Sequence, residues 1–472
     1  KQDYKVKGIL KDGKINLLND FSFKNINLLI NIENKNFDLS DISFTTNKID
    51  FFSNNLKIKR KQDKFFISGD IENNDSKLNN NFLNLLRLSY HDLNFSNAEI
   101  SSKNKFSFII DNKFNYKNLF IKSEISLDNA EYEKPKILSE YFTEIKDIII
   151  FKKHKIKATF KDNNLSLRGL GKIQLEKEFD EIDYSISQSG DKVNIDSNIK
   201  LSGLKIKSQK NLKTFFPKIN EVLNLKDHQI NIKFKDNNLS LRGLGKIQLE
   251  KEFDEIDYSI SQSGDKVNID SNIKLSGLKI KSQKNLKTFF PKINEVLNLK
   301  DHQINIKFKD NNLSLRGLGK IQLEKEFDEI DYSISQSGDK VIFDTKFNSY
   351  KTSFEVKRIN FSNDSKSKLQ LEVFGNYIKG SDLAIDTLLI TTEENKLGLK
   401  NLLIDKYHRI VKFDEISLNY FDNEGKKNKV LIKRKQKNNY EINGSLFNAN
   451  SLISDLLKNK DDKHARIFKN NI

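Results

Sequence analysis

Three histidines occupy equivalent places in a repeated sequence, since His154, His228 and His302 are spaced 74 residues apart. Histidine is a common metal ligand and can act as a general base near neutral pH. Each of these histidines, however, is a whole repeat away from the next and has no second histidine beside it in the sequence. A metal site is therefore not expected, and all three are predicted to be structural turn residues.

A glycine-rich segment, Arg168-Gly-Leu-Gly-Lys172, has some likeness to a phosphate-binding loop. A P-loop requires GxxxxGK followed by Ser or Thr, so that backbone amides meet phosphate and a hydroxyl meets magnesium. Here the glycines are two residues apart and Ile173 follows the lysine. A β-strand is the better prediction for this segment.

Other catalytic patterns are missing from the sequence. GxSxG, HExxH and dinucleotide-binding fingerprints do not occur, and the acidic segment EKEFDEID (176–183) is predicted to be a solvated turn. The chain has no cysteine, which excludes disulfides and thiolate metal sites within it. Neither an enzyme nor a cofactor is expected.

The chain is organised by a repeat. Residues 160–267 recur letter for letter as residues 234–341, so the segment FKDNNLSLRGLGKIQLEKEFDEIDYSISQSGDKV appears three times, and a diverged fourth copy precedes the identical ones. A closed globular core cannot accept a whole inserted unit, whereas a stacked array only becomes longer. The repeat predicts a modular, elongated body.

Within one repeat the apolar residues alternate with polar ones over several short runs. Period-two alternation is typical of strands with one dry face and one wet face, and the segments DNN, QSGDK and SG between the runs suggest hairpin turns. About five antiparallel strands per repeat are predicted. The apolar phase, proposed to line a groove, consists of Ile230, Ile232, Phe234, Leu239, Leu241, Ile247, Leu249, Ile256, Tyr258, Ile260, Val267, Ile269, Ile273, Leu275, Leu278 and Ile280.

Gly243 and Gly245 fall on the same phase, where missing side chains would leave room for a ligand or let the strand bend.

The repeat then changes period. In NLKTFFPKINEVLNLKD, the apolar residues have helical spacing, and Pro291 suits a first helical turn. The residues with this spacing are Phe289, Phe290, Ile293, Val296 and Leu297. Each repeat is therefore predicted to be a strand meander followed by one short amphipathic helix.

The flanking regions carry similar signals. The segment Lys11-Asp12-Gly13 predicts a hairpin turn near the start. The segment LNNNFLNLLRL (78–88) predicts an amphipathic helix, as does NANSLISDLLK near the end, with Asn448 or Asn450 as its N-cap. Three segments result: an N-terminal β-groove segment (1–117), the tandem repeats (118–341) and a C-terminal β segment (342–472).

The chain is basic, with 82 Lys and Arg against 65 Asp and Glu and a net charge of +17. A nucleic-acid binder would gather this charge in one patch, but the lysines are interleaved with Asp, Glu, Asn and Ser on the polar phase of the strands. A solvated face is expected, and a surface for nucleic acid or acidic glycans is disfavoured. The sequence has no run of 18 apolar residues. It is expected to be an internal piece of a longer protein, whose anchor or signal peptide would precede Lys1.

The C-terminal region contains the segments VKFDEISLNYFDNEG and LIKRKQKNNYEINGSLFNANSLISDLLK. The second segment combines a strand, a glycine, a short leucine-containing step and a helix, formed by Ile442, Gly444, Leu446, Ala449, Leu452 and Leu456. From about Phe354 to Lys458 the sequence therefore resembles the AsmA-like envelope proteins, particularly the large YhdP branch. In the repeats, Phe215, Phe216 and Pro217 are similar to the family's "YLP" step.

This resemblance implies a mainly β fold: an elongated, twisted antiparallel sheet that forms an open apolar groove from repeated units, with a few short amphipathic helices. It also implies a periplasmic bridge, anchored in the inner membrane through a segment absent here. Such a bridge carries glycerophospholipids between the inner and outer membranes. Its expected partners are phospholipids and, at the missing termini, membrane surfaces or envelope proteins, without nucleic acid.

The alternation alone leaves a second interpretation open. One-sided strands also occur in β-sandwiches, where two apolar faces pack on each other. In that case the chain would be a structural or adhesive β-repeat rod made of closed sandwich units.

Overall fold

The computed structural model describes residues 4–16, 22–78, 95–136, 138–208, 213, 216–364, 367–407, 409–436, 439–451 and 453–454. The predicted helix at 78–88 lies outside the described residues apart from Leu78, which ends a strand.

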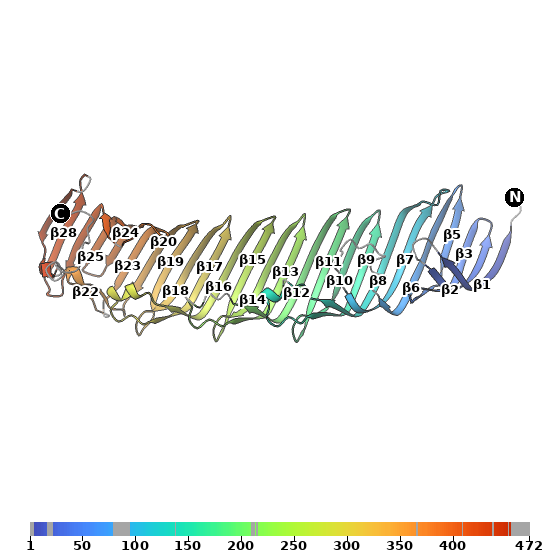
Figure 1. Cartoon of the computed structure of the whole chain (residues 1–472), viewed down its shortest axis with the longest axis horizontal. Coiled ribbons are helices and arrows are strands. Elements are labelled where there is room, and N and C mark those ends of the chain that lie inside the picture. Colours follow the sequence, from blue (N-terminus) through green and yellow to red (C-terminus); the bar gives the residue numbers. More distant parts are fainter. Residues whose placement is uncertain are drawn as a thin grey trace. The chain divides into compact units, whose positions relative to one another are not determined.

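The fold is mainly β, as predicted. Strands account for 73% of the chain and helices for 4%, and 27 strands belong to one large antiparallel sheet (Figure 1). The only other sheet in the described part of the chain is a two-stranded hairpin. A closed sandwich needs two large sheets packed face to face, so the sandwich interpretation is wrong for the residues described.

The chain divides into two compact units. Unit 1 comprises Lys1–Lys207, Asn224–Gly245 and Gln262–Gly264, and unit 2 comprises Ser208–Leu223, Lys246–Ser261 and Asp265–Ile472. The three predicted segments, 1–117, 118–341 and 342–472, remain a prediction.

Unit 1 begins with a meander of eight strands. Each strand pairs antiparallel with the next along most of this region, and the short β4 and β5 share the gap between β3 and β6. The strands are β1 (Lys5–Asn16), β2 (Ser22–Glu33), β3 (Asn36–Thr46), β4 (Ile49–Ser53), β5 (Leu56–Lys61), β6 (Lys64–Leu78), β7 (Phe95–Ile110) and β8 (Tyr116–Glu133).

The hairpin predicted at Lys11-Asp12-Gly13 is wrong, because these residues lie inside β1. Asp12 has a φ of 54°, and the register with β2 shifts between Leu10 and Gly13. A residue with positive φ at a register shift marks a β-bulge. The Asp-Gly pair therefore bends one long strand instead of reversing the chain.

Each repeat forms four strands, not five. The first has β9 (Ile148–Lys161), β10 (Asn164–Gln174), β11 (Phe179–Ser189) and β12 (Lys192–Lys207); the second has β13 (Val222–Lys235), β14 (Asn238–Gln248), β15 (Phe253–Ser263) and β16 (Lys266–Lys281); the third has β17 (Val296–Lys309), β18 (Asn312–Gln322), β19 (Asp328–Ser337) and β20 (Lys340–Ser349). The SG segment, expected to be a turn, lies within β12 and β16.

The predicted helix of the repeat is reduced to one turn. A four-residue helix, α2 (Leu138–Tyr141), precedes β9, and a 3-10 turn, η1 (Lys284–Thr288), precedes β17. Pro291 follows η1 and Val296 already starts β17, so the helical spacing of this segment was misleading. In the irregular connector that follows η1, Phe290 and Ile293 are buried, whereas Phe289 is 46% exposed.

The C-terminal region of unit 2 continues the sheet. After β20, the pairing passes through β23, β24, β25, β27, β28 and β29, and the short β26 also pairs with β25. The strands are β23 (Leu369–Ile378), β24 (Leu383–Thr391), β25 (Lys396–Ile404), β26 (Ile410–Lys412), β27 (Glu415–Phe421), β28 (Lys427–Arg434) and β29 (Tyr440–Leu446); β21 (Phe354–Val356), the turn η2 (Lys357–Ile359) and β22 (Phe361–Asn363) form the separate hairpin.

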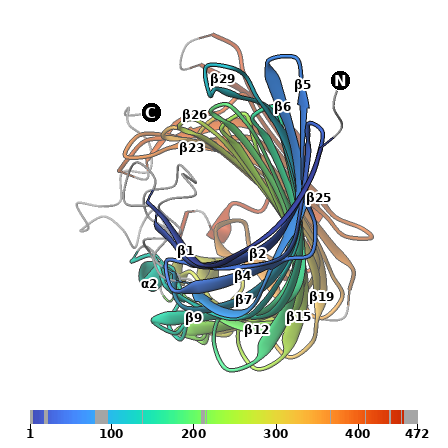
Figure 2. The same cartoon turned by 90° about the vertical axis from the view of Figure 1, so that its right-hand side faces the viewer.

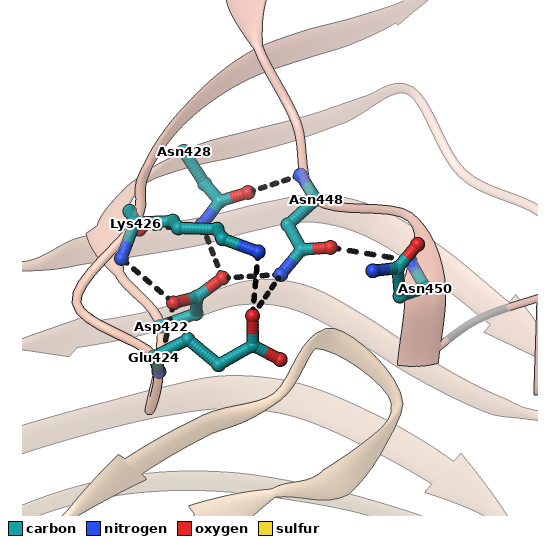
Figure 3. A network of polar contacts seen from close by, with 6 residues as sticks. All are labelled: Asp422, Glu424, Lys426, Asn428, Asn448 and Asn450. Atoms are coloured by element: carbon teal, nitrogen blue, oxygen red, sulfur yellow. Dashed lines mark hydrogen bonds and ion pairs between the residues drawn. The ribbon is translucent and has the colours of Figure 1, made fainter.

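A polar cluster fixes the chain after β29 to the turn between β27 and β28 (Figure 3). The Asn448 amide donates to Asp422 Oδ2 at 2.8 Å, and the Asn428 side-chain oxygen accepts from the Asn448 N–H at 2.7 Å. Asn448 Oδ1 also accepts from the Asn450 N–H, at the start of the predicted helix. Asn448, one of the two N-cap candidates, therefore has a side chain that accepts a hydrogen bond at this position.

Candidate functional site

Of the sixteen residues predicted to line a groove, fifteen lie on the less exposed phase of their strands, and Leu249 directly follows the end of β14. Every one is buried or half-buried, whereas neighbours on the other phase, such as Lys233, Arg242 and Lys274, are exposed. Ile247, Leu275 and Leu278 are buried, with exposed fractions of 8%, 3% and 6%. The alternation in the sequence therefore identifies one apolar face of the sheet, hereafter the apolar face, and the opposite side is the polar face.

The strand registers bring these residues together across neighbouring strands. In unit 2, Ile269 of β16 faces Phe308 of β17, and Ile273 faces Ile304. In unit 1, the same pattern pairs apolar residues of β11 and β12, which are Ile182 with Ile199 and Ile186 with Ile195. Such directly opposed apolar side chains are the main source of side-chain stabilisation in a sheet.

One end of the apolar face in unit 2 is covered by the connectors. Phe290 and Ile293, which follow η1, are 6% and 5% exposed and belong to one buried cluster with Leu275, Leu278 and residues of the later strands. The Phe290 ring meets the rings of Phe347 and Phe354, with centroids 6.0 and 5.3 Å away. These strand ends therefore form a conventional hydrophobic core.

The other end of the same face is open. Along β18 the exposed fraction rises from 6% at Ile321 to 37% at Leu313, and on β19 it reaches 40% at Ile334. These residues approach the hairpin turns, where no connector lies over them among the residues described. The strands themselves are long and curved, as the view in Figure 2 shows. On β18 and β19, the half of the strand nearest the hairpin turns therefore forms an accessible apolar strip beside a packed core.

The space above the repeat glycines is not free for a ligand. A Cβ added at Gly169 would overlap the Tyr184 ring, and one added at Gly171 would overlap the His154 ring. The third copy has the same arrangement, with Tyr332 over Gly317. At Gly245, one of the two predicted positions, an added Cβ would overlap the His228 ring. These glycines therefore make room for the protein's own aromatic rings, and the prediction of ligand space at Gly245 is wrong.

The repeated histidines lie in strands, so the predicted turn position is wrong. His154, His228 and His302 are each 1% exposed, and the residue before each has positive φ, which marks a bulge. His154 Nδ1 lies 3.2 Å from the Tyr184 hydroxyl and its Nε2 lies 3.0 Å from the Lys172 carbonyl oxygen. Burial lowers the pKa of all three histidines, and burial also raises the pKa of Tyr184 to about 12. The neutral imidazole is favoured.

The acidic segment of each repeat is more than a solvated turn, which corrects the expectation for 176–183. Asp254 is 2% exposed and accepts hydrogen bonds from both the N–H and the hydroxyl of Ser276, each at 2.6 Å. Glu250 accepts the N–H of Lys279 at 2.7 Å. The first copy repeats both contacts through Asp180 and Glu176. These carboxylates fasten one strand end to another beside the covered part of the apolar face.

Sequence alternation did not identify a polar cluster on the apolar face of β6 and β7. Asn73 is 2% exposed, donates to Ser76 Oγ at 3.0 Å and to the Ile100 carbonyl oxygen at 3.1 Å, and accepts from the Ser102 hydroxyl. Asn104 joins it by donating to Ser102 Oγ at 2.8 Å. Since the groups pair with one another, they can be buried without an unpaired donor.

Comparisons with known proteins add no name to this geometry: no protein-family model matches the chain, and no curated protein is significantly similar to it. Among the described residues, no helix has the length and apolar character needed to cross a membrane. In that same part of the chain, no cluster of three or more His, Cys, Asp or Glu side chains has the arrangement of a metal site.

Proposed function

We propose that this protein is a non-enzymatic lipid-transfer conduit, in which acyl chains of glycerophospholipids lie along the open part of the apolar face. The support comes from a sheet that is apolar on one side and left uncovered near its hairpin turns. The polar face and the hairpin turns are exposed to water, and in this proposal the head groups of the phospholipids also remain in water.

The energy of moving a lipid explains why such a surface is useful. An acyl chain leaving a bilayer loses about 0.8 kcal/mol per methylene, or about 13 kcal/mol for a chain of about sixteen carbons. An apolar strip in contact with one side of the chain removes a large part of that cost. A protein that offers the strip on strand after strand lowers the barrier at each step.

The observation that carries the proposal is the exposure gradient on the apolar face. A face built only to form a core would be buried along its full length, yet Leu313 and Ile334 are more than a third exposed while Ile321 on the same face is 6% exposed. Exposed apolar surface that runs on over neighbouring strands usually marks an interaction site. Acyl chains are the ligand whose shape and chemistry match a long, mainly apolar strip.

The resemblance of residues 354–458 to AsmA-like proteins supports a specific setting for this activity. By that analogy, the protein would bridge the inner and outer membranes in the periplasm of a Gram-negative envelope, anchored in the inner membrane by a further segment. Phospholipids are the cargo in this proposal, and membrane surfaces or envelope proteins would hold the two ends.

Native mass spectrometry of the purified chain tests the proposal. The expected spectrum contains the protein carrying one or more glycerophospholipid masses, which are released at higher collision energy. A spectrum of the bare protein alone, together with an organic extract that contains no phospholipid, would refute the lipid-conduit function.

A further inference from the structure

A cleft of about 990 Å³ lies on the polar face of unit 1, opposite the proposed lipid surface. Seven strands line it, from β6 to β12, and the six from β7 to β12 carry its two main rows of side chains. On each strand, two side chains that point to the polar face flank one residue that points to the apolar face or, at Gly169, has no side chain. The two rows of side chains form the walls of the cleft. The rows are two residues apart, or about 7 Å, and the strand backbone forms the floor.

The strand registers define both rows. In the first row Ser101, Ser126, Lys155, Leu170, Asp183 and Asn198 succeed one another across the strands; in the second row Lys103, Glu124, Lys157, Arg168, Ser185 and Asp196 do so. Cations that are dispersed in the sequence therefore become neighbours on this exposed face, with carboxylates, serines and an asparagine among them.

Positive charge is concentrated on β9 and β10. Lys157 faces Arg168 directly, and Lys155 is two residues from Lys157 on the same side of β9. None of these three cations has an ion-pair partner within 4.0 Å in the described part of the chain. Like charges placed directly opposite each other destabilise a sheet, so this arrangement lowers stability unless an anion binds between them.

Two of the three carboxylates of the cleft have partners other than the cations on β9 and β10. Asp183 accepts from the Asn198 amide at 3.0 Å, and Asp196 pairs with Lys233 at 3.5 Å and accepts from Asn231 at 3.0 Å. Only Glu124, which faces Lys157, stands close in register to the cationic group. The cations on β9 and β10 thus remain available to an external anion.

The later repeats lack this charge and serve as an internal comparison. In the third copy, Gln303 faces Leu318 and Asn305 faces Arg316. Gln303 and Asn305 occupy the positions that Lys155 and Lys157 have in the first copy. Arg316 there lies 3.9 Å from Asp331, within ion-pair distance. Lysine at both positions is therefore a property of the part of β9 that precedes the identical sequence, and not a requirement of the fold.

We propose that this cleft binds an acidic oligosaccharide, with a carboxylate or phosphate of the sugar held by Lys155, Lys157 and Arg168. Serine hydroxyls and the Asn198 amide in the rows suit sugar hydroxyls, and the 59% exposed Leu170 offers an apolar contact for a sugar ring. An acidic peptide fits less well, because the floor is sheet backbone whose N–H and C=O groups are already paired in the ladder.

The test uses the complete chain, tetragalacturonate as the acidic probe and maltotetraose as its neutral counterpart, with binding followed by isothermal titration calorimetry. The cleft variant Lys155→Gln/Lys157→Asn carries the residues that the later repeats have. The control variant Lys161→Gln/Lys192→Asn removes the same charge near two exposed hairpin turns outside the cleft. Circular dichroism confirms that both variants keep the sheet.

The expected result is that tetragalacturonate binds the unaltered chain and the control variant equally and binds the cleft variant at least about tenfold more weakly, equivalent to about 1.4 kcal/mol. Binding should weaken with added salt, and maltotetraose should not bind. Equal losses in both variants, or no binding to the unaltered chain, would overturn the proposal. Inorganic pyrophosphate binding as tightly as tetragalacturonate would identify a simple anion site and overturn the assignment to a sugar.

Discussion

Two isoleucines in the third repeat form a matched pair on opposite faces of the sheet. Ile334 lies on the apolar face of β19, opposite Phe343, and is 40% exposed. Ile342 lies on the polar face of β20, opposite Ser335, and is 37% exposed. The substitutions Ile334→Asp and Ile342→Asp therefore introduce the same charge at nearly the same exposure, and they differ only in the face that receives it.

The two variants should have nearly equal stability but different lipid content. Both side chains are more than a third exposed, so an aspartate keeps access to water in the lipid-free protein. Against an acyl chain, however, an aspartate costs about 3 kcal/mol, on the order of its cost inside a membrane. This corresponds to roughly a hundredfold loss of affinity at the Ile334 site.

Quantification of co-purified phospholipid by native mass spectrometry, with urea unfolding as the stability check, distinguishes the two variants. Lipid occupancy should fall in the Ile334→Asp protein and remain at the level of the unaltered protein in the Ile342→Asp protein. Equal lipid content in the two variants would refute the assignment of lipid to the apolar face. A large loss of stability in only one of them would show that the pair is not matched.

Three further predictions concern the repeat's internal contacts. Gly171→Ala should destabilise the protein by about 1–3 kcal/mol in urea unfolding, because the new methyl group overlaps the His154 ring; an unchanged midpoint would contradict this packing. Asp254→Ala should cost about 1–3 kcal/mol, because it leaves the N–H and hydroxyl of Ser276 unpaired, and the exposed Asp257→Ala serves as the control. Burial lowers the pKa of His154, His228 and His302, so the unfolded chain binds protons that the folded chain does not. The free energy of unfolding should therefore fall as the pH drops below about 6.5. The variant His154→Gln should show a smaller decrease between pH 7.5 and 5.5.

The strands and their apolar phase were predictable from the sequence because both depend on local alternation. A strand must place alternate side chains on opposite faces, and the letters of residues 230–280 follow this rule with few exceptions. All sixteen predicted residues are consequently buried or half-buried. Whether they line a lipid groove is a separate question, which alternation does not address.

The connector was harder to predict because its apolar residues serve the tertiary core instead of a local helix. Phe290 and Ile293 have helical spacing, yet each is buried by contacts with strands distant in the sequence. A segment of this length gains little from helix formation alone, so packing decides its path. The bulges at Asp12 and beside the histidines were missed for a related reason, since Asp-Gly and similar letters suit a turn and a bulge equally well.

The cleft on the polar face was missed because it depends on registers across six strands. Lys103, Lys155, Lys157 and Arg168 are scattered in the sequence and become neighbours only when the strands are paired. The one local signal was the replacement of Gln and Asn by lysine in the diverged copy, visible when the repeats are aligned on their histidines.

Photo-crosslinking at two adjacent positions of β17 tests the central claim most directly. Ile306 lies on the apolar face, in register with Ser271, and its neighbour Lys307 lies on the polar face, in register with Asp270. With benzoylphenylalanine placed at either position and the protein irradiated in cells, the account predicts phospholipid adducts at position 306 and none at position 307. Adducts at both positions in equal yield, or at neither, would contradict a lipid path along the apolar face.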